Sequence, residues 1–342
     1  MGAGIRLAAE NGMLTLNPEA DQSANIQQLR DLRNEINETY RAKSRSEALQ
    51  DAVIRAAKEM PPVFVPATVN RRTIGKRTLV LCIADCHYGA EWTVHGLRGE
   101  ILNRYDPDVF CARMENLLQQ TRMILEREQI GDVQLLLCGD SLDGMLRSSQ
   151  LMKLRWGVVE SCMRFSEYMA QWISTLSEDA VVSVCGVDGN HTETRTLNSK
   201  RGEFPGENLE KVIFWFLSER LKENPNVLVD GITEQRKHLN IQGFSLLLTH
   251  GTDIRTLENA AKQTMLLYNE RIDYLICGHK HREQEYVSGY TDQGNSVVIR
   301  VPSLCGMDEY AQRLGYGGKP GALGMVLEAG YGRRCIYPIV LS

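Results

Sequence analysis

Residues 273–284 read DYLICGHKHREQ, an apolar run that ends in a glycine and two histidines, His279 and His281. The run has the length and composition of a buried strand. Two histidines beside a glycine turn are not easily buried in a core, and the chain has only seven histidines. The stretch therefore predicts a strand that presents two imidazoles at its carboxyl end.

Four other apolar runs end in the same way, at residues 77–87, 132–140, 180–191 and 244–251. The polar residues at their ends are Asp85 and His87, Asp140, Asn190 and His191, and His250. Helical patterns separate most of the runs, at roughly 106–129, 148–177, 206–222 and 254–271. This alternation predicts an α/β fold whose sheet is covered by helices, and ligands bind such sheets outside the carboxyl ends of the strands.

The chain is expected to close with antiparallel strands. Residues 285–304 and 323–341 alternate around glycine turns, a pattern typical of β-hairpins. The last part of the domain is therefore predicted to be rich in strands.

The N-terminal part shows a different pattern. We expect a mobile N-terminus at 1–22, a helical segment at 23–62, a proline-containing linker at 63–77 and the main domain at 78–342. Apolar residues recur at three- and four-residue steps in the helical segment. Two interpretations stay open: a helix lying on the main domain, or a coiled coil that makes a homo-oligomer.

Composition and charge bear on the partners and the location of the protein. The net charge of −4 and pI of about 6.0 do not by themselves indicate a nucleic-acid partner, although bound cations would change the local field. No stretch is long enough to span a membrane. The nine cysteines include no CxxC pair, and many lie in apolar runs, so we expect reduced thiols in a cytoplasmic protein.

A lone Asp or His at a strand end is usually a turn residue or a helix cap, and we interpret Asp143 and His95 in this way. Five such strand ends together indicate metal-dependent hydrolysis. Oxygen and imidazole ligands suit Mn²⁺ foremost, with Fe or Zn²⁺ as alternatives. One carboxylate can bridge two divalent ions held about 3.5–4 Å apart.

The ordered motifs DCHYG (85–89), GDSLD (139–143), GNH (189–191), THG (249–251) and GHKH (278–281) resemble those of the calcineurin-like metallophosphoesterase superfamily. The resemblance implies a four-layer α-β-β-α sandwich, here with an N-terminal helical extension. It implies that a metal-bridging hydroxide attacks the phosphorus of the substrate and that His191 protonates the leaving oxygen. The implied ligands are Asp85, His87 and His281 for one metal, Asn190, His250 and His279 for the other, and Asp140 for both.

One departure from the superfamily concerns His191. An acid usually follows Gly-Asn-His and supports that histidine, but this chain has Thr192, with Glu193 one residue later. The departure puts the orientation of His191 in question and leaves the metal ligands unaffected.

Within the superfamily, the chain looks most like the SbcD-type DNA-repair nucleases and their short phage-borne relatives. These have a helical segment before the first motif and a PSL segment after the last, here at 302–304. We therefore expect a nuclease acting on DNA phosphodiesters. The alternatives are a hydrolase of cyclic nucleotides, nucleotides or phosphoproteins, and a non-catalytic assembly scaffold. The candidate substrate contacts are Arg147, Arg195 and Tyr310.

Overall fold

The computed structural model describes residues 27–34, 36–37, 75–144, 148–194, 203–204, 206–291, 294–315 and 317–341. The chain divides into two units, Met1–Ala52 and Val53–Ser342. In the first unit, residues 27–34 and 36–37 are helical, within the predicted helical segment. The predicted mobile N-terminus at 1–22 and most of the predicted linker at 63–77 lie outside the described residues.

The first sheet of the second unit has six strands in the order β13-β12-β1-β4-β5-β6. Strands β1, β4, β5 and β6 are parallel, whereas β12 and β13 are antiparallel additions at one edge. The strands are β1 (Arg77–Ile83), β4 (Asp132–Leu137), β5 (Val181–Gly186), β6 (Val227–Val229), β12 (Gly321–Glu328) and β13 (Gly332–Val340). The predicted C-terminal hairpin at 323–341 is thus confirmed.

The second sheet has five strands in the order β10-β11-β9-β8-β7. Its three central strands, β8, β9 and β11, run parallel, and the two edge strands are antiparallel to their neighbours. The strands are β7 (Arg236–Ile241), β8 (Phe244–Thr249), β9 (Tyr274–Cys277), β10 (Gln284–Thr291) and β11 (Gly294–Arg300). The two sheets face each other across one apolar core, to which β1 contributes Val80 and Cys82 and β8 contributes Leu246 and Leu248.

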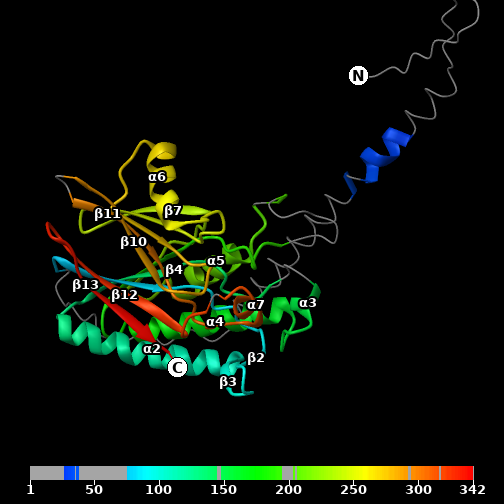
Figure 1. The fold of residues 1–342 in the computed structure, drawn as a ribbon, viewed down its shortest axis with the longest axis horizontal. Coiled ribbons are helices and arrows are strands. Elements are labelled where there is room, and N and C mark those ends of the chain that lie inside the picture. The colour runs from blue at the N-terminus through cyan, green and yellow to red at the C-terminus, as the bar shows by residue number, and fades with distance from the viewer. Residues whose placement is uncertain are drawn as a thin grey trace, which may run out of the picture. The chain divides into compact units, whose positions relative to one another are not determined.

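Helices cover the outer faces of both sheets (Figure 1). Helices α2 (Pro107–Glu128), α4 (Val158–Leu176) and α5 (Leu209–Leu221) lie on the side of the first sheet. Helix α6 (Leu257–Tyr268) packs on the second sheet through a separate apolar cluster. The molecule therefore has the predicted four layers, and its fold is that of the metallophosphoesterases.

Local sequence explains where these helices begin. The Asp106 carboxylate accepts hydrogen bonds from the backbone N–H groups of Asp108 and Val109, both at 2.9 Å, and Pro107 opens α2. Asn208 caps α5 in the same way, accepting from the N–H of Glu210 at 3.0 Å. Polar caps thus set the starts of these two helices.

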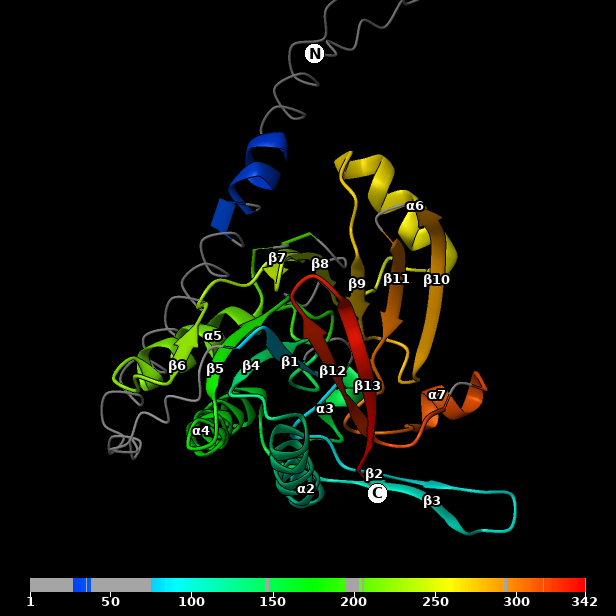
Figure 2. The same ribbon diagram turned by 90° about the vertical axis from the view of Figure 1, so that its left-hand side faces the viewer.

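The structure differs from the predicted elements in two places. The single helix expected at 148–177 is divided into α3 (Ser148–Leu151) and α4, because Gly157 takes an extended backbone conformation before α4. A hairpin made of β2 (Trp92–His95) and β3 (Ile101–Tyr105) was not anticipated. Figure 2 shows this hairpin reaching out beside α7 (Glu309–Arg313). His95 is the last residue of β2 in this hairpin.

The described residues include no helix with the length and apolar character that crossing a membrane requires.

Candidate metal centre

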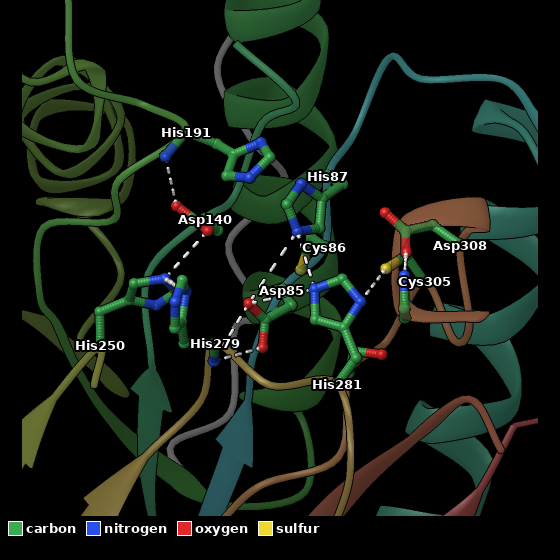
Figure 3. Close-up of polar contacts among 12 residues, drawn as sticks. Asp85, Cys86, His87, Asp140, His191, His250, His279, His281, Cys305 and Asp308 are labelled. Carbon is green, nitrogen blue, oxygen red and sulfur yellow. Dashed lines mark hydrogen bonds and ion pairs between the residues drawn. The ribbon is translucent and has the colours of Figure 1, made fainter. Parts of the chain in front are cut away.

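The five predicted strand ends meet at one place, formed by the loops that follow β1, β4, β5, β8 and β9 (Figure 3). Backbone hydrogen bonds tie these loops together: the N–H of Asp85 donates to the carbonyl of Gly139, and that of Gly278 donates to the carbonyl of His250. The structure brings together all eight of the residues predicted for the core of the site: Asp85, His87, Asp140, Asn190, His191, His250, His279 and His281.

One group of ligand atoms surrounds Nε2 of His250. This nitrogen lies 2.9 Å from Oδ2 of Asp140, 3.0 Å from Oδ1 of Asn190 and 3.2 Å from Nδ1 of His279. Nδ1 of His250 lies 2.8 Å from the carbonyl oxygen of Cys138, to which it donates. A neutral His250 therefore directs the lone pair of Nε2 at other electron-rich atoms, an arrangement that a divalent cation stabilises.

A second group lies around His87 and His281. Their Nε2 atoms are 3.2 Å apart, and Oδ1 of Asp85 lies 3.9 Å and 3.7 Å from them, respectively. Sγ of Cys305 is 4.0 Å from the other ring nitrogen of His281, Nδ1. Burial raises the pKa of the Cys305 thiol well above its usual value, and Cys305 forms a candidate metal-binding group with His87 and His281.

Asp140 lies between the two groups. Its side chain is buried, and its ligand atoms cluster both with His250 and His279 and with His87 and His191. Oδ1 of Asp140 also accepts a hydrogen bond from the backbone N–H of His191 at 2.7 Å. This is the position that a carboxylate shared by two cations would need.

The carboxylates and histidines shift one another's pKa in the absence of a cation. Burial alone would lower the pKa of His87 and of His250, but the nearby carboxylates, Asp143 and Asp140 foremost, raise both to about 9. Burial and the adjacent His250 lower the pKa of His279 to about 4. Burial alone would raise the pKa of Asp140, but the charge on His250 holds it well below its usual range. Such mutual shifts are typical of functional sites.

The backbone of the site is strained. Asp85, His87, Asp140, His279 and His281 all have positive φ, between 44° and 72°. Non-glycine residues rarely adopt this conformation, and it concentrates at active sites, where the surrounding structure enforces it.

A glycine allows two of these loops to touch. A Cβ atom on Gly189 would lie 2.2 Å from the backbone nitrogen of Asp140. Only glycine therefore fits at this approach of the third motif to the second.

Asp143 was interpreted as a turn residue, and this was wrong. Its Oδ1 lies 2.7 Å from Nδ1 of His191 and 3.5 Å from Nδ1 of His87, and the side chain is buried. The two histidines lower the pKa of Asp143 against the effect of burial. Asp143 therefore supplies the acidic support for His191 that the sequence after Gly-Asn-His lacks. Thr192 is buried, and its hydroxyl has no hydrogen-bond partner among the described residues.

A second buried acid was also missed. Glu210 on α5 is fully buried, and its carboxylate contacts the backbone N–H and the hydroxyl of Ser141, each at 2.8 Å. It thereby fixes the residue that follows Asp140. The sequence signal was a carboxylate on the same helix face as Ile213, Phe214 and Leu217.

The predicted substrate contacts do not join the cluster within the described part of the chain. Arg147 and Arg195 lie outside the described residues, and Tyr310 is an exposed residue of α7. Two basic side chains near the second motif form ion pairs with acidic side chains. Lys153 pairs with Glu309 at 2.8 Å, and Arg155 pairs with Asp108 at 2.7 Å and also with Glu91.

This fold, with candidate oxygen and imidazole ligands at the carboxyl ends of the strands, defines a metal-dependent phosphoesterase. The chain belongs to the same family as the SPbeta prophage-derived uncharacterized protein YonJ of Bacillus subtilis strain 168. The two are 30% identical over 320 residues, which cover 92% of this chain and 77% of YonJ. No protein-family model matches the chain.

Solved structures similar to this chain include a novel archaeal phosphodiesterase, with 14% identity, a TM-score of 0.37, and coverage of 77% of this chain and 99% of that one. Another is Vps29 complexed with Zn²⁺ from Entamoeba histolytica, with 13% identity, a TM-score of 0.31, and the same coverage of 77% and 99%.

Proposed function

We propose that the protein is a two-metal phosphodiesterase that hydrolyses DNA. The observation that carries the proposal is the convergence of seven oxygen and imidazole ligands on two adjacent groups that share Asp140. Two divalent cations held there would polarise the phosphate oxygens and supply a nucleophile from water near neutral pH. The oxygen and nitrogen donors favour Mn²⁺, with Fe or Zn²⁺ as alternatives.

In this proposal His191 is the general acid. Its Nδ1 donates to Asp143, which leaves Nε2 to carry the proton that is transferred. Water loses a proton to the solvent and its oxygen bonds to the phosphorus, the bond from phosphorus to the leaving oxygen breaks, and the leaving oxygen takes the proton from His191, which is then protonated again from the solvent. Asp143 acts through His191 and fixes the orientation of its ring.

The choice of DNA as substrate follows the resemblance to SbcD-type nucleases and their phage-borne relatives, and YonJ is itself prophage-derived. Cyclic nucleotides, nucleotides and phosphoproteins are the other substrates of the class. A scaffold without activity would not need a complete ligand set. We also propose a cytoplasmic location, in keeping with nine free cysteines.

Assembly through the N-terminal helix is a further part of the proposal. Leu29, Leu32 and Ile36 recur at helical spacing, and all three side chains are exposed. An apolar stripe of this kind favours a coiled coil between copies of the chain.

The test is hydrolysis of bis-p-nitrophenyl phosphate by the purified protein with Mn²⁺, followed by single-stranded DNA, double-stranded DNA and cyclic nucleotides. We expect turnover of the diester and of DNA, with DNA cleavage falling steeply as salt rises because phosphate contacts are screened. Turnover of cyclic nucleotides alone would move the substrate to the second class. No turnover of any diester by metal-loaded protein would contradict the proposed function.

A further inference from the structure

Basic side chains gather next to the candidate metal centre, on the face of the second sheet that α6 covers. Lys280 stands between the candidate ligands His279 and His281 in the chain, and its Nζ donates to the backbone carbonyl of Arg255 at 3.2 Å. Arg255 lies in the loop that leads into α6, and its side chain is exposed, whereas Lys280 is partly buried. Two cations therefore border the loop that carries two of the candidate ligands.

A third cation, Arg300, lies in the sheet nearby. It is the last residue of β11, and it pairs with Gln284 on β10 and with Cys277 on β9. Cys277 belongs to the apolar cluster under α6, so Arg300 is on the same face of the sheet. Burial, and then the charges of Arg300 and Arg282, lower the pKa of Lys280. These cations are therefore close enough to act on one another.

No acid neutralises the three cations within the described part of the chain. Lys280, Arg255 and Arg300 form no ion pair there. Arg300 is buried, and only its Nη1 has a hydrogen-bond partner among the described residues, Oε1 of Gln284 at 2.9 Å. A buried guanidinium stays charged, and a buried charge without a countercharge costs free energy. An anion bound above it would offset that cost.

The acids of this region are engaged elsewhere. Glu258, in the first turn of α6, pairs with a lysine one turn along the helix at 3.0 Å, and Asp253 pairs with Arg236. Burial, and then the neighbouring Glu285, raise the pKa of Glu283, whose charge therefore faces another acid. The surface around Lys280 thus carries an excess of positive charge on a chain whose net charge is −4.

This charge suits a phosphate. Lysine and arginine are the side chains that most often contact the phosphates of nucleic acids, and such contacts fix the position of the strand. Divalent cations at the metal centre would add to the same positive field. A strand with one phosphate at the metal centre would therefore bring a neighbouring phosphate to these cations.

We propose that Lys280 and Arg255, supported by the buried charge of Arg300, bind a phosphate of a nucleic-acid strand adjacent to the phosphate held at the metal centre. The inference rests on the proposed phosphodiesterase function and deepens it, because the substrate must then carry more than one phosphate. The two residues position the strand and take no part in the transfer of protons.

The first experiment measures how salt weakens the binding of a fluorescent oligothymidylate to the Mn²⁺-loaded full chain. All proteins carry His191→Ala, which slows cleavage. Each phosphate contact with a single strand contributes about 0.7 to the slope of log K against log salt concentration, so Lys280→Gln should reduce the magnitude of the slope by about 0.7. The glutamine amide can still donate to the Arg255 carbonyl, so the substitution removes only the charge.

Two further variants separate charge from structure. Lys280→Arg keeps the charge and should keep the original slope. Arg255→Gln changes an exposed side chain, so it should fold normally, and it should reduce the slope as Lys280→Gln does. A slope that is unchanged in both glutamine variants would overturn the assignment of this surface.

The matched control is Lys222→Gln. Lys222 is an exposed lysine at the C-terminal end of α5, where it pairs with Glu219 at 3.2 Å. Its removal should leave the slope unchanged. A reduction as large as that of Lys280→Gln would show a general effect of net charge and would also overturn the assignment.

The second experiment compares the cleavage of substrates of different length. With wild-type His191, an oligothymidylate should be cleaved with a kcat/KM about tenfold or more above that of thymidylyl-thymidine, because only the longer strand reaches the cations. Lys280→Gln should lower this ratio, and Lys280→Arg should preserve it. Equal kcat/KM for the two substrates would contradict a second phosphate contact.

Failure of this inference differs from failure of the proposed function. If the wild-type protein hydrolyses bis-p-nitrophenyl phosphate but neither the slope nor the ratio depends on Lys280, the phosphate contact is overturned while the proposed function stands. If no diester is hydrolysed by the metal-loaded protein, both are overturned.

Discussion

Oδ1 of Asp143 lies 2.7 Å from Nδ1 of His191, although the two residues come from different strand ends, 48 positions apart. The contact fixes which nitrogen of His191 faces the metal centre. Asp143 also reaches Nδ1 of His87 at 3.5 Å. One buried carboxylate therefore orients both the proposed acid and a proposed metal ligand.

His191→Ala should lower kcat on a diester by about 10²–10⁴-fold, the usual contribution of acid–base assistance. Metal content should stay unchanged, because in this account His191 is not a ligand. The control is His238→Ala, which removes a histidine on β7 whose Nε2 contacts Ser245 at 2.8 Å. Loss of metal from His191→Ala, measured by elemental analysis, would contradict the assigned role.

Asp143→Asn should weaken the contacts that orient both His191 and His87. We expect kcat and Mn²⁺ affinity each to fall by about 10–100-fold, the usual effect of removing a residue that orients a metal ligand. Calorimetric titration of Mn²⁺ and steady-state kinetics measure the two quantities separately. Wild-type affinity together with wild-type kcat would show that Asp143 is only a turn residue.

Mn²⁺ binding should release protons near pH 7.5. In the metal-free protein the pKa values of His87 and His250 are raised to about 9, so both rings are protonated at this pH and must lose a proton to bind a cation. Apparent affinity should rise with pH and level off above about 9. Calorimetry in buffers of different ionisation enthalpy counts the protons, and a pH-independent affinity with no proton release would contradict this.

Those two histidines also affect the stability of the metal-free protein. Their pKa values in the folded protein lie above the ordinary value of 6.5. Their stabilising contribution is therefore complete below about pH 6.5 and is lost as the pH rises through about 9.

Glu210, which is not a candidate metal ligand, should make the stability of the protein depend on pH. Burial raises its pKa from 4.5 to about 7, so its contribution to stability is present below about pH 4.5 and is lost as pH rises through about 7. Glu210→Gln keeps groups able to bond both atoms of Ser141 and cannot ionise. The free energy of unfolding of Glu210→Gln relative to wild type should therefore increase between pH 5 and pH 8.

Urea denaturation of metal-free protein at the two pH values tests this prediction. Glu115→Gln, an exposed position on α2, is the control and should show no such change. An identical pH dependence in Glu210→Gln and the wild type would show that Glu210 does not titrate in this range.

The layers and the meeting of the candidate ligands at one place could be predicted from the sequence because strands of a parallel sheet end at one edge. Asp85, Asp140 and His250 each follow a run of buried apolar residues, so their meeting place is set by topology alone. The hairpin at β2 and β3 escaped prediction because its strands are short and Ile101 and Leu102 are exposed, which breaks the usual alternation of buried and exposed residues.

The supporting acids could not be predicted in this way. Asp143 and Glu210 act through contacts with residues 48 and 69 positions away, and such pairings depend on the packed structure. Taken alone, Asp143 has the sequence surroundings of an ordinary turn residue. A carboxylate on an apolar helix face was the one local signal for Glu210.

The most direct test of the two-metal claim is anomalous diffraction from crystals grown with Mn²⁺, for wild type and Asp140→Asn. We expect two peaks in the wild type, one among Asp85, His87 and His281 and one among Asn190, His250 and His279, with Asp140 between them. Asp140→Asn should weaken or lose both peaks. A single Mn²⁺ ion in the wild type, or two undiminished peaks in the variant, would contradict the two-metal claim.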